Sequence, residues 1–478
     1  MRFLLLLSAL LIISSCGGNL PQEDVKVPSP KLLSSVPADG AEDVKSGDVE
    51  LVLTFDKNVK CGSGTGGFSI DGDALIDRVN AYNENVTVYL KNIQANARYT
   101  LSVAEGVISG FKQNEEVMPA FSVSFSTEKR EIPKDYTLNP VPTLVNPSAS
   151  VQAKKLYEFL VKESGSKMLS GVMSGTSNTN DHLDKVYSVT GSHPALSGYD
   201  FLFLHYSPTP SDWTWVQNYN DISAAKSHWE AGGVVSYMWH WNVPSDEAAW
   251  KAGKENYNFD NYAFYSNKTK FDIKRALTPG TWENEFMLKD IEEAASYLKL
   301  LADANIPVIW RPLHEAAGNY DIYGPDGAWF WWGRGGAESC KQLWKLLYEK
   351  LVNEYKLNNL IWVWTLDATP GAEDQYAAWY PGDDYVDIVG VDIYEDNTNA
   401  KTRQCQAAVN LTKGRKLVTI SECGNIPNPD KCKAEGNRWS WFMVWPSDEG
   451  YPLNTNVYLN SVMKSSSVYT RENMPKLK

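Results

Sequence analysis

The sequence predicts an α/β protein in which a (β/α)8 barrel follows a small all-β sandwich of the immunoglobulin type. Between residues 150 and 478, eight apolar segments typical of buried strands occur with helical segments between them, which is the pattern of a (β/α)8 barrel. Between residues 31 and 127, apolar side chains recur instead with a period of two, as in the half-buried strands of a sandwich. A polar, proline-containing linker is predicted at residues 128–149.

The N-terminus predicts export and a lipid anchor. The positive pair Met1-Arg2 precedes an apolar run from Phe3 to Ile13 that is too short to span a bilayer, so residues 1–15 are a predicted signal peptide. Ser14-Ser15-Cys16-Gly17 resembles the lipobox of bacterial lipoproteins, which implies that Cys16 becomes the lipidated first residue. An ordinary signal peptide with a chance cysteine is the alternative. We therefore expect a lipid-anchored protein of the bacterial cell envelope, tethered by residues 16–30. The outer membrane, the cell surface and the periplasmic face all remain open.

The domain predicted at residues 31–127 contains four segments with alternating apolar side chains: Val49–Phe55, Val86–Leu90, Tyr99–Val103 and Phe121–Phe125. Turn-forming clusters separate them. The segment from Ser35 to Ala41 resembles bacterial Ig-like modules of extracellular enzymes. The domain at residues 31–127 has no aromatic cluster typical of a sugar-binding face. We therefore expect it to be a spacer, with a binding module as the alternative.

The barrel prediction rests on eight strand candidates in the domain at residues 150–478. They are Met168–Ser174, His193–Leu202, Gly233–Trp239, Pro307–Leu313, Leu360–Thr365, Val386–Ile393, Lys416–Ser421 and Trp439–Val444. Helices are expected after a cap at Ser148–Ser150, from Glu283 to Ala304 and from Lys341 to Tyr355, where apolar residues recur at helical spacing. Pro312 is unfavourable inside a central strand, so it marks the point where strand four leaves the ladder.

Catalytic groups of such barrels lie at the C-terminal ends of the strands. In this chain strand four ends at His314-Glu315 and strand seven at Ser421-Glu422. Two glutamates that face one cleft are what glycoside hydrolysis requires, because one must donate a proton and the other must attack the sugar or activate water. A buried Glu–His pair and a surface carboxylate are the alternatives for these positions. The run Trp329-Phe330-Trp331-Trp332 follows strand four and suggests stacking against flat, weakly polar sugar rings.

Several other functions are disfavoured. The formal charge of −13 argues against a nucleic-acid partner. The six histidines have no metal-ligand spacing, and no G-x-S-x-G motif occurs, so no metal and no cofactor are expected. Five cysteines remain after Cys16, so at least one is unpaired if disulfides form. Cys423 follows Glu422 but has no histidine that qualifies as its catalytic partner.

The chain resembles glycoside hydrolase family 26, the β-mannanase family. The resemblance covers most of the barrel and is carried by these segments in order: Trp310–Glu315, Trp329–Gly333, Asn359–Trp364, Tyr380–Asp383 with Val386–Tyr394, Ser421-Glu422, and Trp439–Trp441 with Trp445. It implies a retaining endo-β-1,4-mannanase that acts on β-mannan. We expect the protein to be a monomer.

Residue by residue, the resemblance implies roles for eight side chains. Glu315 is the implied acid/base and Glu422 the implied nucleophile, with Tyr394 hydrogen-bonded to the nucleophile. The subsite for the attacked sugar is implied at His240, His314, Asp392 and Trp445, and Trp329 is implied to stack on the leaving-group side.

Two departures affect details of the subsites. Residues Asn319–Ala328 intervene between Gly318 and Trp329, and Pro446 stands where some members have arginine. The alternatives left open are a β-glucanase, a β-1,3-xylanase or a mannobiose-releasing exo-enzyme of the same family, and a non-catalytic glycan-binding lipoprotein.

Overall fold

The computed structural model describes residues 26–62, 64–72, 74–129, 135–175, 179–206, 218–253, 260–367, 375–446 and 453–478. The chain divides into two compact units, residues 1–132 and residues 133–478. The predicted signal peptide and Cys16 lie outside the described residues. In the part of the chain that the structure describes, no helix has both the length and the apolar composition needed to cross a bilayer.

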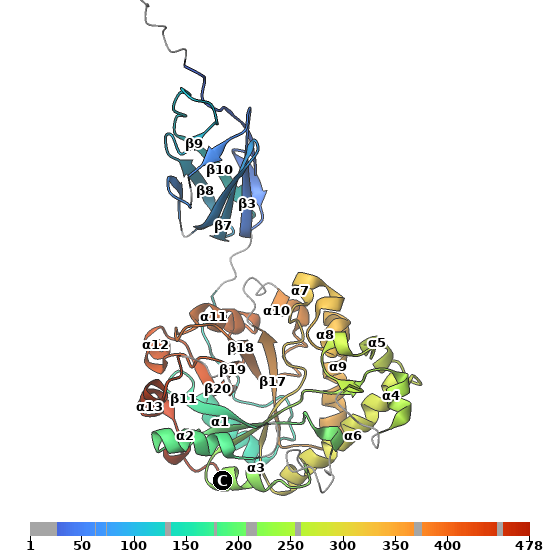
Figure 1. Cartoon of the computed structure of the whole chain (residues 1–478). Coiled ribbons are helices and arrows are strands. Elements are labelled where there is room, and N and C mark those ends of the chain that lie inside the picture. Colours follow the sequence, from blue (N-terminus) through green and yellow to red (C-terminus); the bar gives the residue numbers. More distant parts are fainter. Residues whose placement is uncertain are drawn as a thin grey trace, which may run out of the picture. The chain divides into compact units, whose positions relative to one another are not determined.

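The first unit is the predicted sandwich of two antiparallel-rich sheets, drawn in blue in Figure 1. One sheet has the order β1-β3-β7-β6 and the other β2-β10-β8-β5, with a separate pair β4–β9. The strands are β1 Leu32–Val36, β2 Ala41–Val44, β3 Gly47–Phe55, β4 Lys60–Cys61, β5 Phe68–Ile70, β6 Leu75–Tyr82, β7 Asn85–Ile93, β8 Arg98–Val103, β9 Ile108–Ser109 and β10 Phe121–Thr127. Leu51, Val88 and Leu101 are fully buried between the sheets, so the period-two pattern correctly predicted the inward faces.

The second unit is a closed barrel of eight parallel strands. Around the barrel they are β11 Met168–Gly175, β12 Leu196–Asp200, β13 Val234–Met238, β16 Val308–Arg311, β17 Leu360–Asp367, β18 Ile388–Ile393, β19 Leu417–Cys423 and β20 Trp439–Val444, which pairs with β11 again. All eight predicted strands are confirmed. Strand β16 ends at Arg311, so Pro312 does mark the exit from the ladder. The short strand β21 Val468–Tyr469 pairs with β11, and β14 Val243–Pro244 and β15 Tyr262–Ala263 form a separate pair.

Helices form an outer layer round the strands (Figure 1). Their bounds are α1 Val151–Glu163, α2 Asp181–Thr190, α3 Ser223–Glu230, α4 Glu247–Ala252, α5 Ile273–Ala276, α6 Trp282–Asp303, α7 Tyr320–Tyr323, α8 Trp331–Arg334, α9 Ala337–Tyr348, α10 Tyr376–Trp379, α11 Thr402–Leu411, α12 Pro429–Ala434 and α13 Asn456–Met463. Single turns occur at Leu204–Tyr206, Ser266–Lys268, Pro325–Gly327 and Arg471–Asn473, and α9 continues as a π-helix over Glu349–Glu354. The predicted cap is present, because the Ser150 side chain accepts a hydrogen bond from the Ala153 amide at the start of α1.

Residues 135–149, most of the predicted linker, pack along the barrel rather than standing free. The Val141 amide donates to the Arg415 carbonyl, and the Val145 amide donates to the Asp387 carboxylate at 2.7 Å. Leu138 and Leu144 are buried among barrel residues. This segment reads as a linker in the sequence, but in the structure it is part of the barrel unit.

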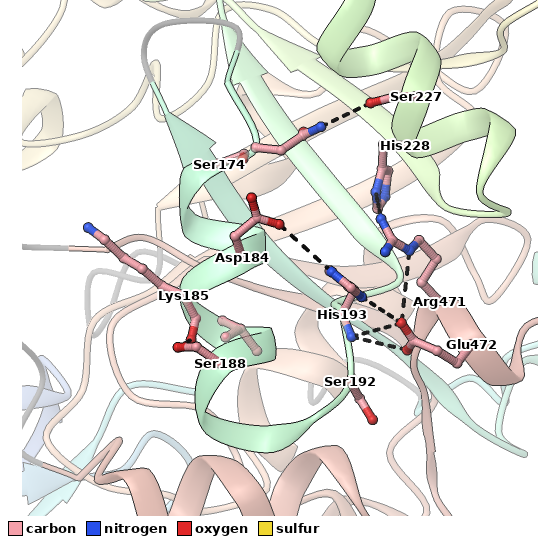
Figure 2. A network of polar contacts seen from close by, with 12 residues as sticks. Ser174, Asp184, Lys185, Ser188, Ser192, His193, Ser227, His228, Arg471 and Glu472 are labelled. Atoms are coloured by element: carbon pink, nitrogen blue, oxygen red, sulfur yellow. Dashed lines mark hydrogen bonds and ion pairs between the residues drawn. The ribbon is translucent and has the colours of Figure 1, made fainter.

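A network of charged side chains fastens the C-terminal segment to the loop after α2 (Figure 2). His193 lies between Asp184 and Glu472, and its Nδ1 is 2.7 Å from a Glu472 oxygen. Arg471 reaches from Glu472 towards His228, whose pKa burial lowers to about 3. This network contacts the N-terminal end of β12, so it supports the barrel and lies away from the strand ends where catalysis is expected.

Candidate active site

The carboxyl ends of seven adjacent strands, from β12 to β20 around the barrel, present polar or aromatic side chains to one region. Asp200 ends β12, Arg311 ends β16 and Asp367 ends β17. Asp392 and Glu422 lie near the ends of β18 and β19, while His240, Glu315, Tyr394 and Trp445 lie just beyond strand ends. The barrel therefore gathers the predicted residues at the end where (β/α)8 enzymes carry their chemistry.

Glu422 is held by two donors, one on each carboxylate oxygen. An Arg311 guanidinium nitrogen bonds Oε1, and the Tyr394 hydroxyl donates to Oε2 at 2.6 Å. Glu422 and Arg311 are buried, whereas Tyr394 is 49% exposed. Charge-assisted hydrogen bonds of this kind favour the ionised carboxylate and fix its direction.

The same guanidinium joins Glu422 to the neighbouring strand. Arg311 Nη1 donates to Asp392 Oδ2 at 2.9 Å, and Asp392 pairs with Glu422 in the register of β18 and β19. On the other side Asp392 pairs with Asp367 of β17. Three acidic residues thus form a row across adjacent strands, with Arg311 contacting two of them.

Glu315 lies on a tightly folded segment directly after β16. Its φ is 50° and that of Leu313 is 51°, a left-handed conformation that is rare for residues with a side chain. Gly318 and Gly333 permit this fold: a Cβ at Gly318 would lie 2.5 Å from the Trp329 ring, and one at Gly333 would lie 2.0 Å from the Ala316 carbonyl. The strained segment is therefore held by close packing against Trp329 and α8.

Glu315 is in an environment that keeps its proton. Burial, then the charges of Asp392 and Asp367, hold the pKa of Glu315 well above its usual range, while Arg311 acts in the opposite direction. A carboxylic acid that stays protonated near neutral pH can act as a general acid. The site therefore combines a carboxyl group whose pKa is raised with a second carboxyl group that is hydrogen-bonded on both oxygens.

The two histidines predicted at the sugar subsite lie side by side. His240 Nε2 is 3.2 Å from His314 Nε2, and the rings meet edge to face with centroids 4.5 Å apart. Burial, together with Arg311 and His240, holds the pKa of His314 well below its usual range. Trp445 packs against His240 with ring centroids 5.7 Å apart, and it is half-buried.

The aromatic run at Trp329–Trp332 is used differently from the sequence prediction. Only Trp329 is partly exposed; Trp331 and Trp332 are fully buried and Phe330 is nearly so. Trp331 Nε1 donates to the Trp241 carbonyl at 2.7 Å, and Trp332 Nε1 donates to the His314 carbonyl at 2.9 Å. The expectation that the whole run offers stacking surface was wrong, because α8 turns Trp331 and Trp332 into the core, where they support the His314–Glu315 segment.

Three further charged residues at the site were not among the predicted ones: Asp200, Arg311 and Asp367. Asp200 accepts hydrogen bonds from His240, and Arg311 and Asp367 flank the carboxylates described above. The predicted second strand runs two residues past Asp200 and the fifth stops two residues short of Asp367. The sequence signal that could have identified these three residues is that each is a charged residue near the end of a strand candidate.

Among the described residues, neither a reactive cysteine nor a metal site is found. Cys61, Cys340, Cys405, Cys423 and Cys432 are free thiols there. Burial raises the pKa of the Cys423 thiol far above the physiological range, which leaves it protonated and unreactive. Among the residues that the structure describes, no group of three or more His, Cys, Asp or Glu side chains is arranged to hold a metal ion.

Comparison with known proteins identifies the family. Residues 145–473 match the sequence model of glycosyl hydrolase family 26, and residues 26–127 match that of a bacterial Ig-like domain. The chain belongs to glycosyl hydrolase family 26. This family-26 chain is 35% identical to mannan endo-1,4-beta-mannosidase B of Piromyces sp over 72% of its own length and 55% of that relative. It is 37% identical to mannan endo-1,4-beta-mannosidase of Thermothelomyces thermophilus over 69% of its own length and 61% of the relative. The chain thus spans less than two thirds of either relative.

Solved structures give the same result. A β-mannanase from a symbiotic protist of the termite Reticulitermes speratus, complexed with gluco-manno-oligosaccharide, is 36% identical and superimposes with a TM-score of 0.60, covering 71% of this chain and 99% of that one. The family-26 domain of a Prevotella bryantii endo-beta-mannanase/endo-beta-glucanase is 34% identical with a TM-score of 0.61, over 70% of this chain and 99% of that domain.

Proposed function

We propose that the barrel is a retaining endo-β-1,4-mannanase that hydrolyses β-mannan, such as galactomannan or glucomannan, through two glutamates. The observation that carries the proposal is the contrast between them. Glu422 accepts hydrogen bonds from Arg311 and Tyr394, which favours a carboxylate, whereas the pKa of Glu315 is held well above its usual range. A retaining glycosidase needs this pairing of an ionised nucleophile with a protonated acid.

The reaction proceeds in two displacements. The Glu422 carboxylate attacks the anomeric carbon, the glycosidic C–O bond breaks, and Glu315 gives its proton to the departing oxygen. Glu315, now a carboxylate, takes a proton from water, and the resulting hydroxide attacks the anomeric carbon and releases Glu422. Each displacement inverts the anomeric centre, so the product keeps the β configuration.

The remaining predicted residues serve substrate binding in this proposal. His240, His314, Asp392 and Trp445 line the subsite for the attacked sugar, and Tyr394 holds the nucleophile. The partly exposed Trp329 stacks on the leaving-group side, next to the Glu315 segment. Both glutamates count against a non-catalytic glycan-binding protein, because binding alone requires neither.

The choice of β-mannan over other β-glycans rests on the relatives. The two family relatives above are mannan endo-1,4-beta-mannosidases, and the termite-symbiont structure holds a gluco-manno-oligosaccharide. The test is release of reducing sugars from galactomannan, glucomannan, lichenan and β-1,3-xylan by the purified chain. Preferential hydrolysis of the two mannans is expected. Preferential hydrolysis of lichenan or xylan would move the assignment to a β-glucanase or a xylanase, and mannobiose as the sole early product would indicate exo action.

We also propose that the enzyme acts as a monomer anchored to the bacterial cell envelope through a lipid on Cys16. The support is the lipobox-like segment Ser14-Ser15-Cys16-Gly17. Replacing Cys16 with Ala should release the protein from the membrane fraction while its activity on mannan stays unchanged. Membrane retention of the Cys16→Ala variant would exclude lipidation at this position.

A further inference from the structure

Asp200 is a buried carboxylate devoted to one partner at the active site. Its exposed fraction is 1%, and it accepts two hydrogen bonds from His240. The His240 backbone amide donates to Oδ1 at 2.9 Å, and His240 Nδ1 lies 2.5 Å from Oδ2. Because Oδ2 of the carboxylate can only accept, His240 Nδ1 carries a hydrogen.

The next question is which ring donates in the contact between His240 and His314. His240 Nε2 faces His314 Nε2 at 3.2 Å, and one hydrogen must lie between them. The other ring nitrogen of His314, Nδ1, is buried and has no hydrogen-bond partner among the described residues. A buried N–H without an acceptor costs more than a bare acceptor nitrogen, so the favoured arrangement leaves His314 Nδ1 without a hydrogen.

The hydrogen between the rings therefore belongs to His314 Nε2, and His240 Nε2 accepts it. Both imidazoles are then neutral, which agrees with the low pKa of His314. All hydrogen bonds in the chain run in one direction, from His314 to His240 to Asp200. A neutral pair also adds no positive charge beside Glu315, whose proton a nearby cation would help to remove.

We propose that Asp200 is a positioning residue that sets the tautomers of His240 and His314 and thereby keeps the subsite and the adjacent Glu315 in their working state. Asp200 does not touch the substrate. It acts through His240, which contacts the His314 ring, while Trp332 Nε1 bonds the His314 carbonyl. This role rests on the proposed function of the barrel, since it concerns the sugar subsite and the acid of that reaction.

The substitution Asp200→Asn isolates this role, because it keeps the size of the side chain but replaces one acceptor oxygen with a donor amide. If Oδ1 still accepts the His240 amide, the new Nδ2 group faces Nδ1 and forces that nitrogen to become the acceptor. The His240 hydrogen then moves to Nε2, and His314 must carry its own hydrogen on the buried Nδ1. If the amide is flipped, Nδ2 meets the His240 backbone N–H instead. Every orientation thus disrupts the chain.

Asp387→Asn provides a matched control. Asp387 is equally buried and also accepts two N–H groups, from Val145 at 2.7 Å and Trp362 at 2.8 Å. It lies just before β18, at the opposite end of the barrel from the active site. Both variants should unfold at lower temperature than the wild type, and kinetics are measured well below both transitions.

The expected result is a selective loss of turnover. For Asp200→Asn, kcat on mannohexaose should fall by about tenfold or more, as expected when a histidine is held in the wrong tautomer, while KM changes far less. For Asp387→Asn, kcat should stay within about twofold of the wild type. A wild-type kcat in Asp200→Asn, or an equal loss in both variants, would overturn the proposal.

A spectroscopic measurement on the wild-type protein tests the proposal without requiring that Asp200→Asn folds or that a substrate is hydrolysed. Long-range 1H–15N correlation of the 15N-histidine-labelled wild-type protein reports which ring nitrogen of each of the six histidines is protonated. His240, assigned by its loss in His240→Gln, should be neutral with its hydrogen on Nδ1. An imidazolium or an Nε2–H tautomer at His240 would contradict the proposal even if Asp200→Asn fails to fold. A wild-type protein that shows the expected tautomer but hydrolyses no mannan would instead sink the proposed function.

Discussion

Asp392 and Glu422 lie opposite each other on adjacent strands of the barrel and share the guanidinium of Arg311. All three side chains are almost completely buried, so charge compensation of the two carboxylates depends strongly on Arg311, the cation that contacts both among the described residues. Register places the two carboxylates side by side, and the forked geometry of arginine allows one side chain to bond both. The donors that favour the carboxylate form of the proposed nucleophile, Arg311 and Tyr394, thus come from β16 and from the residue directly after β18.

Replacing Arg311 should therefore harm stability and catalysis together. Arg311→Met leaves two buried carboxylates uncompensated, which should lower the free energy of unfolding by about 3–5 kcal/mol at pH 7. Arg311→Lys keeps the charge but loses the fork, so it should fold better than Arg311→Met yet still lose most of the activity. Urea unfolding and kcat/KM on mannohexaose measure the two effects. Wild-type activity in Arg311→Lys would show that a single cation, without the fork, is sufficient.

The pH dependence should report the proton on Glu315. The acid must be protonated, so activity is lost as pH rises through the pKa of Glu315, which forms the basic limb of a bell-shaped profile. The charge of Asp367 raises that pKa, so Asp367→Asn should move the basic limb of kcat/KM to lower pH. Because neighbouring carboxyls titrate together, the shift belongs to the cluster as a whole. A basic limb unchanged in Asp367→Asn, or moved to higher pH, would argue against this origin of the pKa.

The leaving group provides an independent test of Glu315. Glu315→Ala should slow mannohexaose, whose departing oxygen needs a proton, far more than an activated aryl mannoside, whose departing phenolate does not. Rates on both substrates, compared with the wild type, measure the difference. Equal slowing of both substrates would remove Glu315 from the role of acid.

The insert between Gly318 and Trp329 should affect long substrates selectively. The Trp329 amide donates to the Gly318 carbonyl and closes the base of the insert, and Tyr320 packs edge-on against Trp379 with centroids 5.3 Å apart. Tyr323 remains 69% exposed. Because the insert starts four residues after Glu315, we expect it to extend the distal subsites on the leaving-group side. Replacing Asn319–Gly327 with a short Gly-Ser link should change the product pattern on mannohexaose and leave aryl mannosides little affected. Unchanged products and kinetics on mannohexaose would reduce the insert to a surface feature.

The contact between His193 and Glu472 at the C-terminus should stabilise the fold at neutral pH and lose this effect at acid pH. Burial acts to raise the pKa of Glu472, but the hydrogen bonds from His193 outweigh it and leave the pKa below its usual value of 4.5. A carboxyl with a depressed folded-state pKa stabilises the fold above its unfolded pKa, and this contribution is lost as pH falls through the folded value. Glu472→Gln should thus lower Tm at pH 7, and the difference from the wild type should shrink below pH 4. Glu354→Gln, in an exposed pair with Lys350, is the control and should change Tm little at either pH.

The parts of the molecule that the sequence predicted are those that depend on local pattern. Apolar segments alternating with helical ones identified all eight barrel strands. A glutamate after strand four and another at the end of strand seven then fell at the correct end of the barrel, because parallel strands share one edge. Contacts between side chains on different strands could not be predicted in this way. Arg311 contacts both Asp392 and Glu422 only because of the register of four strands, and single-strand patterns carry no information on that register.

The aromatic run Trp329–Trp332 shows that the sequence also did not predict which side chains are exposed to solvent. Four consecutive aromatic residues look alike in the sequence, but α8 begins at Trp331 and turns the last two indoles inward, leaving only Trp329 partly exposed. A period-3.6 argument needs a longer helix than four residues to assign faces. Asp200 was missed for a related reason, because the predicted second strand extended past its true end.

The configuration of the first product tests the central claim most directly. Proton NMR of the wild-type enzyme with mannohexaose, recorded before mutarotation, reports both whether a β-mannan chain is cleaved and how. In retaining enzymes the two carboxyl groups lie about 5–5.5 Å apart and leave no space for a water at the anomeric carbon, so on the proposed mechanism the new reducing end should appear first as the β anomer. An initial α anomer, or no cleavage at all, would contradict the account.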